Sequence, residues 1–162
     1  MNKILLTGFK GMNNSSRMLV EKLSSENILL TNSFAGLKRD IDSISEDYDC
    51  VIMFGVDKSL TSTVRIEKCA RKNGKVIDSI IKPEGIVESL KKAGITPCIS
   101  EESTSYLCNE AYWHMLKKYS GRAVFIHIPT IKHINEQFIN NMTYALGLIR
   151  IAYELKEISY GT

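Results

Sequence analysis

One cysteine of this chain lies where a thiol is able to do chemistry. Cys108 stands about one turn into a predicted helix, in the stretch SEESTSYLCNEAYWHML. The positive end of a helix dipole favours the thiolate, which is the nucleophilic form of cysteine. The same residue shares a helical stripe with Tyr112, Met115 and Tyr119, which is typical of a small core residue. The stretch alone leaves both roles open, and a nucleophile needs a base.

Three histidines are candidates for that base. His127 lies in AVFIHIP, near the end of an apolar run of strand length, where a buried imidazole needs partners for its nitrogens. It is expected to be either a general base at the edge of a sheet or a core histidine bonded to the backbone. His114 falls on a different helix face from Cys108, and His133 is expected in a loop, so both are weaker candidates.

A carboxylate is the third group that such a site requires. Glu67 lies in VRIEKCARK, a run of alternating charges that is usually solvated. A carboxylate that orients a catalytic histidine would complete a nucleophilic triad, and Glu67 is a candidate for that role. Nothing near Glu67 in the sequence decides between a solvated residue and a catalytic one.

Other motifs predict neither a cofactor nor a metal. The turn from Gly8 to Gly11 follows a strand but matches neither glycine-rich nucleotide pattern. The pair Glu101 and Glu102 has no second acidic cluster to share a metal with. The other three cysteines, Cys50, Cys69 and Cys98, show no metal-ligand spacing, and we predict that they pack in the interior.

Apolar runs of strand length alternate with amphipathic stretches along the chain. The stretch 56–81 is ambiguous, since residues 64–69 fit a strand or a charged helix. The expected strands cover 3–7, 27–31, 50–54, 95–99 and 123–128. Five helices are expected: one capped by Asn14 or Ser15, one over 36–46, one that begins at Pro83 and ends before Gly94, one from Ser103 or Thr104 to about Tyr119, and one over 134–157. The last has an inward stripe of Ile134, Phe138, Met142, Ala145, Ile149, Ala152 and Leu155.

This alternation predicts a three-layer α/β/α sandwich around a mostly parallel sheet, as one domain over residues 1–162. Ligands of such folds bind at the carboxyl ends of the strands. The turn at Gly8 and the end of the 123–128 strand, where His127 lies, are therefore the expected site.

The composition fits a globular protein and argues against several partners. Hydrophobic residues make up 44% of the chain and charged residues 24%, with 21 Lys and Arg against 18 Asp and Glu. So small a surplus predicts neither nucleic acid nor a membrane as partner. No apolar run has the length of a membrane span, and no signal peptide is recognisable, so we expect a cytoplasmic protein with free thiols.

Several segments together resemble pyroglutamyl peptidase I (pyrrolidone-carboxylate peptidase), a family of cysteine peptidases. ISEESTSYLCNEAYW resembles the nucleophile segment of that family, and AVFIHIP resembles its histidine segment. KILLTGF, NSSRMLVEKL, CVIMFG and RIEKCARKN match in the same order, so the resemblance covers nearly the whole chain. The family fold is an α/β/α sandwich with a mixed sheet.

The resemblance implies an activity and its residues. Cys108 matches the nucleophile, His127 the base and Glu67 the third catalytic residue, while Phe9 matches one of two aromatic residues that hold the substrate lactam. The implied substrate is a peptide with a blocked N-terminus, from which pyroglutamate is hydrolysed without metal or cofactor. Family members often form tetramers, so a homo-oligomer is also implied.

The chain departs from the family where substrate is recognised. The second aromatic residue falls in the shortened segment Lys10–Gly11–Met12, and most of the segment before Pro83 that contributes to the family pocket is missing. The chain thus resembles a shortened member. Two alternatives follow: an enzyme that acts on another small acyl amide, or a non-catalytic relative that binds a peptide or partner through a reduced pocket.

Overall fold

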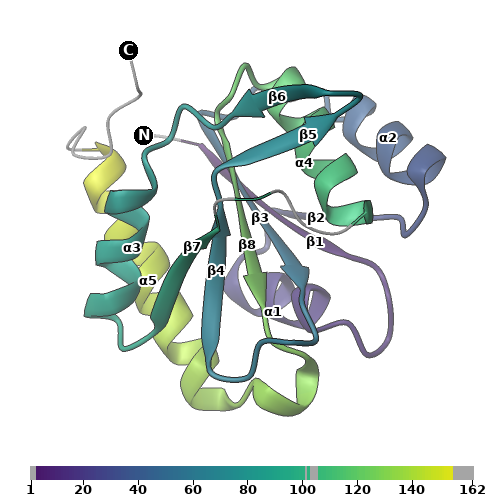
Figure 1. Cartoon of the computed structure of the whole chain (residues 1–162). Coiled ribbons are helices and arrows are strands. Elements are labelled where there is room, and N and C mark those ends of the chain that lie inside the picture. Colours follow the sequence, from purple (N-terminus) through teal and green to yellow (C-terminus); the bar gives the residue numbers. More distant parts are fainter. Residues whose placement is uncertain (1–2, 101, 103–105, 155–162) are drawn as a thin grey trace.

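A mixed sheet of six strands forms the centre of the molecule (Figure 1). The computed structural model describes residues 3–100, 102 and 106–154. The strand order is β2-β1-β3-β8-β4-β7, in which β4 runs antiparallel to β8 and all other neighbours are parallel. The strands are β1 (Ile4–Phe9), β2 (Asn27–Leu30), β3 (Cys50–Val56), β4 (Thr63–Glu67), β7 (Thr96–Ser100) and β8 (Ala123–Ile128).

Helices cover both faces of this sheet, which confirms the predicted three layers (Figure 1). One face packs against α1 (Ser15–Leu23), α3 (Pro83–Lys92) and α5 (Glu136–Glu154). The other packs against α2 (Phe34–Asp42) and α4 (Tyr106–Lys118). None of the helices in the described ranges is long and apolar enough to cross a membrane.

The central strands are apolar on both sides because both of their faces are covered. In β8, Val124 and Ile126 belong to the core beneath α1 and α5, whereas Phe125 belongs to the core beneath α4. Since side chains alternate along a strand, His127 lies on the same face as Phe125. The strand thus delivers an imidazole to the α4 side of the sheet, at its carboxyl end.

The ambiguous stretch 56–81 consists of strands joined by turns and contains no helix, so the helical alternative for residues 64–69 is wrong. Val64 and Ile66 are buried in the core that α1, α3 and α5 cover, and the charged residues that alternate with them, Arg65 and Glu67, face the α4 side of the sheet. After β4 the chain forms a two-stranded hairpin of β5 (Cys69–Lys72) and β6 (Lys75–Asp78). Its turn, Asn73-Gly74, has positive φ at both residues, as tight hairpins require.

The other elements lie close to where they are predicted. Asn14 caps α1 by accepting hydrogen bonds from backbone N–H groups, and α3 begins at Pro83. The predicted helix 36–46 is displaced, because Ser33 caps α2 and it ends at Asp42. The predicted caps Ser103 and Thr104, and Leu155 on the inward stripe of α5, lie outside the described residues.

Candidate active site

His127 and Glu67 form a buried hydrogen-bonded pair between β8 and β4. The Nδ1 atom of His127 lies 2.8 Å from Oε1 of Glu67, and only 1% of the histidine and 3% of the glutamate are exposed. A carboxylate oxygen only accepts, so Nδ1 carries the proton and donates it. This leaves Nε2 as the imidazole atom able to exchange a proton with a reactant. Glu67 is therefore not the solvated residue that its charge run allowed.

Cys108 reaches the same place from α4, directly above Gly55 of β3. A Cβ atom built on Gly55 would lie 2.8 Å from Sγ of Cys108, so the missing side chain is what makes room for the thiol. Gly55 pairs with His127 across β3 and β8. Neighbouring strands are about 4.8 Å apart, so the thiol lies beside the imidazole.

A small recess joins these three residues. Glu67, Cys108 and His127 line it together with Cys69, Asn109, Tyr112 and Phe125. Its volume is about 10 Å³, roughly the space that one water molecule needs. A substrate acyl group is too large to fit inside, so the reacting carbonyl must approach from the mouth of the recess.

Two residues that the sequence did not single out hold Glu67. The Nε atom of Arg65 donates to Oε1 of Glu67 at 2.9 Å, and the NH2 group of the same guanidinium lies 2.6 Å from Oδ2 of Asp57. Tyr112 fixes the backbone of Glu67 by donating its hydroxyl proton to the carbonyl oxygen at 2.8 Å. The alternation of charged and apolar residues in VRIEK is a signal for Arg65, because a strand puts Arg65 and Glu67 on one face.

Glu67 stays ionised despite its burial. Burial raises the pKa of this carboxyl, but hydrogen bonds from His127 and Arg65, with the charge of His127, outweigh that effect, and the pKa ends below its usual value. A carboxylate that keeps its charge at low pH orients the imidazole and stabilises it when it is protonated.

Aromatic rings support the recess, and a second aromatic pair lies at the start of α4. The rings of Phe125 and His127 pack with centroids 4.8 Å apart, and Tyr112 packs on Phe125. Two residues before Cys108, the Tyr106 ring is 76% exposed and meets the exposed Phe34 edge to face, with centroids 4.7 Å apart. The first turn of α4 thus carries an exposed aromatic residue that packs on α2.

The remaining predicted site residues lie elsewhere. Phe9 is buried in the core beneath α2 and α4 and does not line the recess, so a contact with substrate remains a prediction for it. His114 pairs with Glu110 at 3.1 Å, and His133 is exposed in a short 3-10 helix. Glu101, half of the acidic pair, lies outside the described residues.

The other cysteines divide into buried and exposed thiols. All four cysteines are free, as predicted. Cys50 and Cys69 are buried, but Cys98 is exposed on β7, so the prediction that it packs in the interior is wrong. β7 lies at the edge of the sheet, and its side chains are covered less completely than those of the central strand β8. Within the described part of the chain, no group of three or more His, Cys, Asp or Glu side chains is arranged for a metal.

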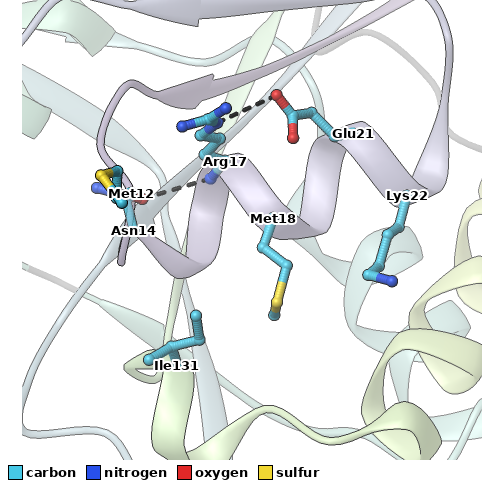
Figure 2. Close-up of a pocket in the computed structure, with 7 residues that line it drawn as sticks. All are labelled: Met12, Asn14, Arg17, Met18, Glu21, Lys22 and Ile131. Carbon is cyan, nitrogen blue, oxygen red and sulfur yellow. Dashed lines mark hydrogen bonds and ion pairs between the residues drawn. The ribbon is translucent and has the colours of Figure 1, made fainter.

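A much wider groove lies away from the recess, along α1 (Figure 2). Its volume is about 600 Å³, and it is lined by Met12, Asn14, Arg17, Met18, Glu21, Lys22 and Ile131. It shares no residue with the recess around Cys108. Met12 is 92% exposed, so the shortened loop after β1 places no aromatic ring there and turns this side chain to solvent.

The fold is shared with solved peptidase structures. The pyrrolidone carboxyl peptidase from Thermococcus litoralis superposes with a TM-score of 0.76 at 17% identity, over 100% of this chain and 99% of that one. Pyroglutamyl peptidase I from Bacillus amyloliquefaciens gives 0.72 at 19% identity, over 90% and 95%. The Thermus thermophilus pyrrolidone carboxyl peptidase gives 0.74 at 19%, over 90% and 98%.

No family model and no curated protein matches the chain. The structural matches extend over nearly the full length of both partners, and the strands and helices that carry Glu67, Cys108 and His127 fall within them. The chain therefore has the pyroglutamyl peptidase I fold that its sequence resemblance predicts.

Proposed function

We propose that this protein is a cysteine peptidase that hydrolyses an N-terminal pyroglutamyl amide, or the amide of a related small acyl group. The observation that carries the proposal is the convergence of Cys108, His127 and Glu67, from three different elements, on one recess. The Glu67–His127 hydrogen bond adds an oriented base. The fold supports it as well, because the matching structures are of enzymes named as pyroglutamyl or pyrrolidone carboxyl peptidases.

The proposed reaction is acyl transfer in two steps. The Cys108 thiolate attacks the carbonyl carbon of the blocked N-terminal residue, and a C–S bond forms while the C–N bond breaks. His127 delivers a proton from Nε2 to the departing amine of the shortened peptide. His127 then takes a proton from water, which attacks the thioester, releases the acid and returns the thiol.

Two further groups assist both steps. Glu67 holds the Nδ1–H of His127 and compensates the positive charge of the imidazolium whenever it forms. Backbone N–H groups at the start of the Cys108 helix are proposed to stabilise the oxyanion, because helix N-termini carry unsatisfied donors. No metal or cofactor takes part in this scheme.

The substrate is proposed to be a peptide with a blocked N-terminus. Its acyl ring would lie at the mouth of the recess, against the exposed aromatic surface of Tyr106 and Phe34. Phe9 is proposed as a wall of the acyl site. Residues 1–162 are proposed to act as one domain, in the cytoplasm and as a homo-oligomer, without nucleic acid or membrane as partner.

One observation favours a related acyl group as the alternative substrate. In the family, a second aromatic residue of the first loop helps to hold the lactam, and in this chain that loop carries Met12, which is 92% exposed. An acyl site with fewer aromatic walls gives up stacking worth about 1 kcal/mol for each lost pair. A different small acyl group would not depend on that contact.

Hydrolysis of a pyroglutamyl coumarylamide, within a panel of small acyl amides, tests the proposal. Wild type is expected to release the fluorophore from at least one amide, and C108A is expected to be inactive. C98A is the matched control, since it removes an exposed thiol outside the recess and should leave the rate unchanged. Equal rates for wild type and C108A, or no turnover on any amide, would overturn the peptidase proposal and favour a binding role.

A further inference from the structure

We infer that Arg65 is a positioning residue, which holds Glu67 in place and thereby orients His127 toward Cys108. The inference rests on the proposed function, because it assigns a task within the same site. Arg65 is not part of the proposed reaction, because its described contacts are with Glu67 and Asp57 and not with the thiol.

Arg65 lies directly across from His127. The two residues are paired in the antiparallel ladder of β4 and β8, and their side chains leave the sheet on the same face. The guanidinium donates from Nε to Oε1 of Glu67 at 2.9 Å, the same oxygen that accepts from Nδ1 of His127. One carboxylate oxygen therefore joins the base to the arginine.

The arginine is itself held from its other side. Its NH2 group pairs with Oδ2 of Asp57 at 2.6 Å. Ser59 holds the second oxygen of Asp57, with its backbone N–H at 2.8 Å and its hydroxyl at 2.7 Å. The backbone of Asp57 is anchored to the end of β8, where its N–H donates to Ile128 at 3.0 Å.

This chain of contacts fixes the geometry of the base. A planar guanidinium with donors in a rigid fork has one orientation that satisfies both carboxylates, and lysine has no such fork. The Arg65 side chain is only 17% exposed and that of Glu67 only 4%, so water screens their interaction weakly. Without Arg65, the buried carboxylate would keep its hydrogen bond from His127 but lose the cationic donor that fixes its position.

Among the described residues, few other charges face the pair. The titratable and charged groups whose contacts with the recess or with Glu67 are described are Arg65 and Asp57 on the side of β3 and β4, Cys108 and Tyr112 from α4, and Cys69 from β5. Arg65 is the cation in this described set. If substituting Arg65 moves the acid side of the pH profile of Cys108 alkylation, that change is therefore assigned to Glu67.

The decisive measurement is the rate of Cys108 alkylation by iodoacetamide between pH 4 and 9, followed by mass spectrometry of the Cys108 peptide. In R65M the carboxylate loses a cation that keeps it ionised, so activation of the thiol should fail at a pH about one unit higher than in wild type. R65K retains the charge and should recover part of that shift. D57N, which removes only the outer anchor, should shift the acid limb less and in the same direction.

The matched control is R122M. Arg122 is also partly buried and pairs with Asp47 and two backbone carbonyls, but it does not line the recess. R122M should change thermal stability without moving the alkylation profile. An acid limb that stays in place in R65M and D57N would overturn the inference, as would one that moves equally in R122M.

Activity provides a second readout. If the peptidase proposal holds, R65M should lower kcat on the hydrolysed amide by about 10- to 100-fold and change KM little, because Arg65 orients the base and does not bind substrate. Alkylation requires no substrate. A wild type that hydrolyses nothing yet shows the R65M shift would overturn the peptidase proposal and leave the role of Arg65 standing.

Discussion

Nδ1 of His127 and Oε1 of Glu67 lie 2.8 Å apart, although the two residues are separated by 60 positions in the sequence and belong to antiparallel strands. The ladder pairs Glu67 with Phe125, so the hydrogen bond runs diagonally across one face of the sheet. The imidazole is thereby turned so that Nε2 is available to the thiol. The consequences of this contact can be measured.

E67Q should remove the charge and leave the shape. An amide can donate where the carboxylate only accepts, so His127 can be held in the wrong tautomer, and kcat for the hydrolysed amide should fall about 10³-fold. KM should change little, because Glu67 lies behind the histidine. The measurement is steady-state kinetics beside a thermal melt.

The chain contains a matched control for that variant. Glu110 also pairs with a histidine, His114, and with Lys72, but it lies outside the recess. E110Q should therefore lower stability without a comparable loss of kcat. Similar kcat losses in E67Q and E110Q would contradict a specific role for Glu67.

The parts of the fold that follow local rules were predictable from the sequence. Apolar runs and helix caps placed β1, β3, β8 and α1, and the Pro83 start placed α3. The hairpin β5–β6 was missed although Asn73-Gly74 is a strong turn signal, because the charged flanking residues hide the alternation that marks a strand. Strands β5 and β6 form a separate two-stranded sheet that packs on α4, so they lack the apolar runs of the central sheet.

The site was predictable only in part. The resemblance assigned roles to Cys108, His127 and Glu67, but the antiparallel pairing of β4 with β8 is a long-range property that no local pattern encodes. Alternation along β4 places Arg65 on the same face as Glu67, but only that pairing brings it opposite His127. For the same reason, the space that Gly55 leaves for the thiol becomes evident only when α4 is packed on β3.

G55A should push the thiol out of position. The added Cβ would lie 2.8 Å from Sγ of Cys108 and 2.6 Å from Cζ of Phe125, closer than such atoms can approach. The fold should survive with a loss of about 1–3 kcal/mol, while kcat/KM falls more than about tenfold. Circular dichroism and kinetics measure the two effects.

G147A provides the comparison. A Cβ on Gly147, within α5, meets nothing within 4 Å, so this variant should keep its activity and gain up to about 1 kcal/mol of helix stability. An active G55A enzyme with unchanged alkylation at Cys108 would show that the thiol does not depend on the space above Gly55.

Cys108 should react with iodoacetamide faster than Cys98 at neutral pH, although Cys98 is the more exposed thiol. The expected reason is the imidazole beside Cys108, which accepts the thiol proton. H127A should bring the two rates together. Burial raises the pKa of Cys50 to about 12, so that thiol should remain unmodified. Faster modification of Cys98 in wild type would contradict an activated nucleophile.

Asp57 should make the fold sensitive to acid. Burial raises the pKa of this carboxyl, but hydrogen bonds from Ser59 and Arg65 outweigh it and lower the pKa from 3.8 to about 2. A pKa lowered by folding gives stability that is present above the unfolded value and is lost as pH falls through the folded value. The shift corresponds to about 2 kcal/mol.

D57N should therefore unfold at lower urea than wild type at pH 6, with a free energy of unfolding about 2 kcal/mol smaller. The difference should shrink as the pH falls from about 4 to 2, because the Asp57 carboxyl is protonated over this range in the unfolded chain before it is protonated in the folded protein. D47N removes a carboxylate that is 83% exposed in its pair with Arg122, so it should change stability little at either pH. A D57N deficit that is equally large at pH 2 and pH 6 would show that the loss is one of packing, and that the Asp57 charge does not stabilise the fold.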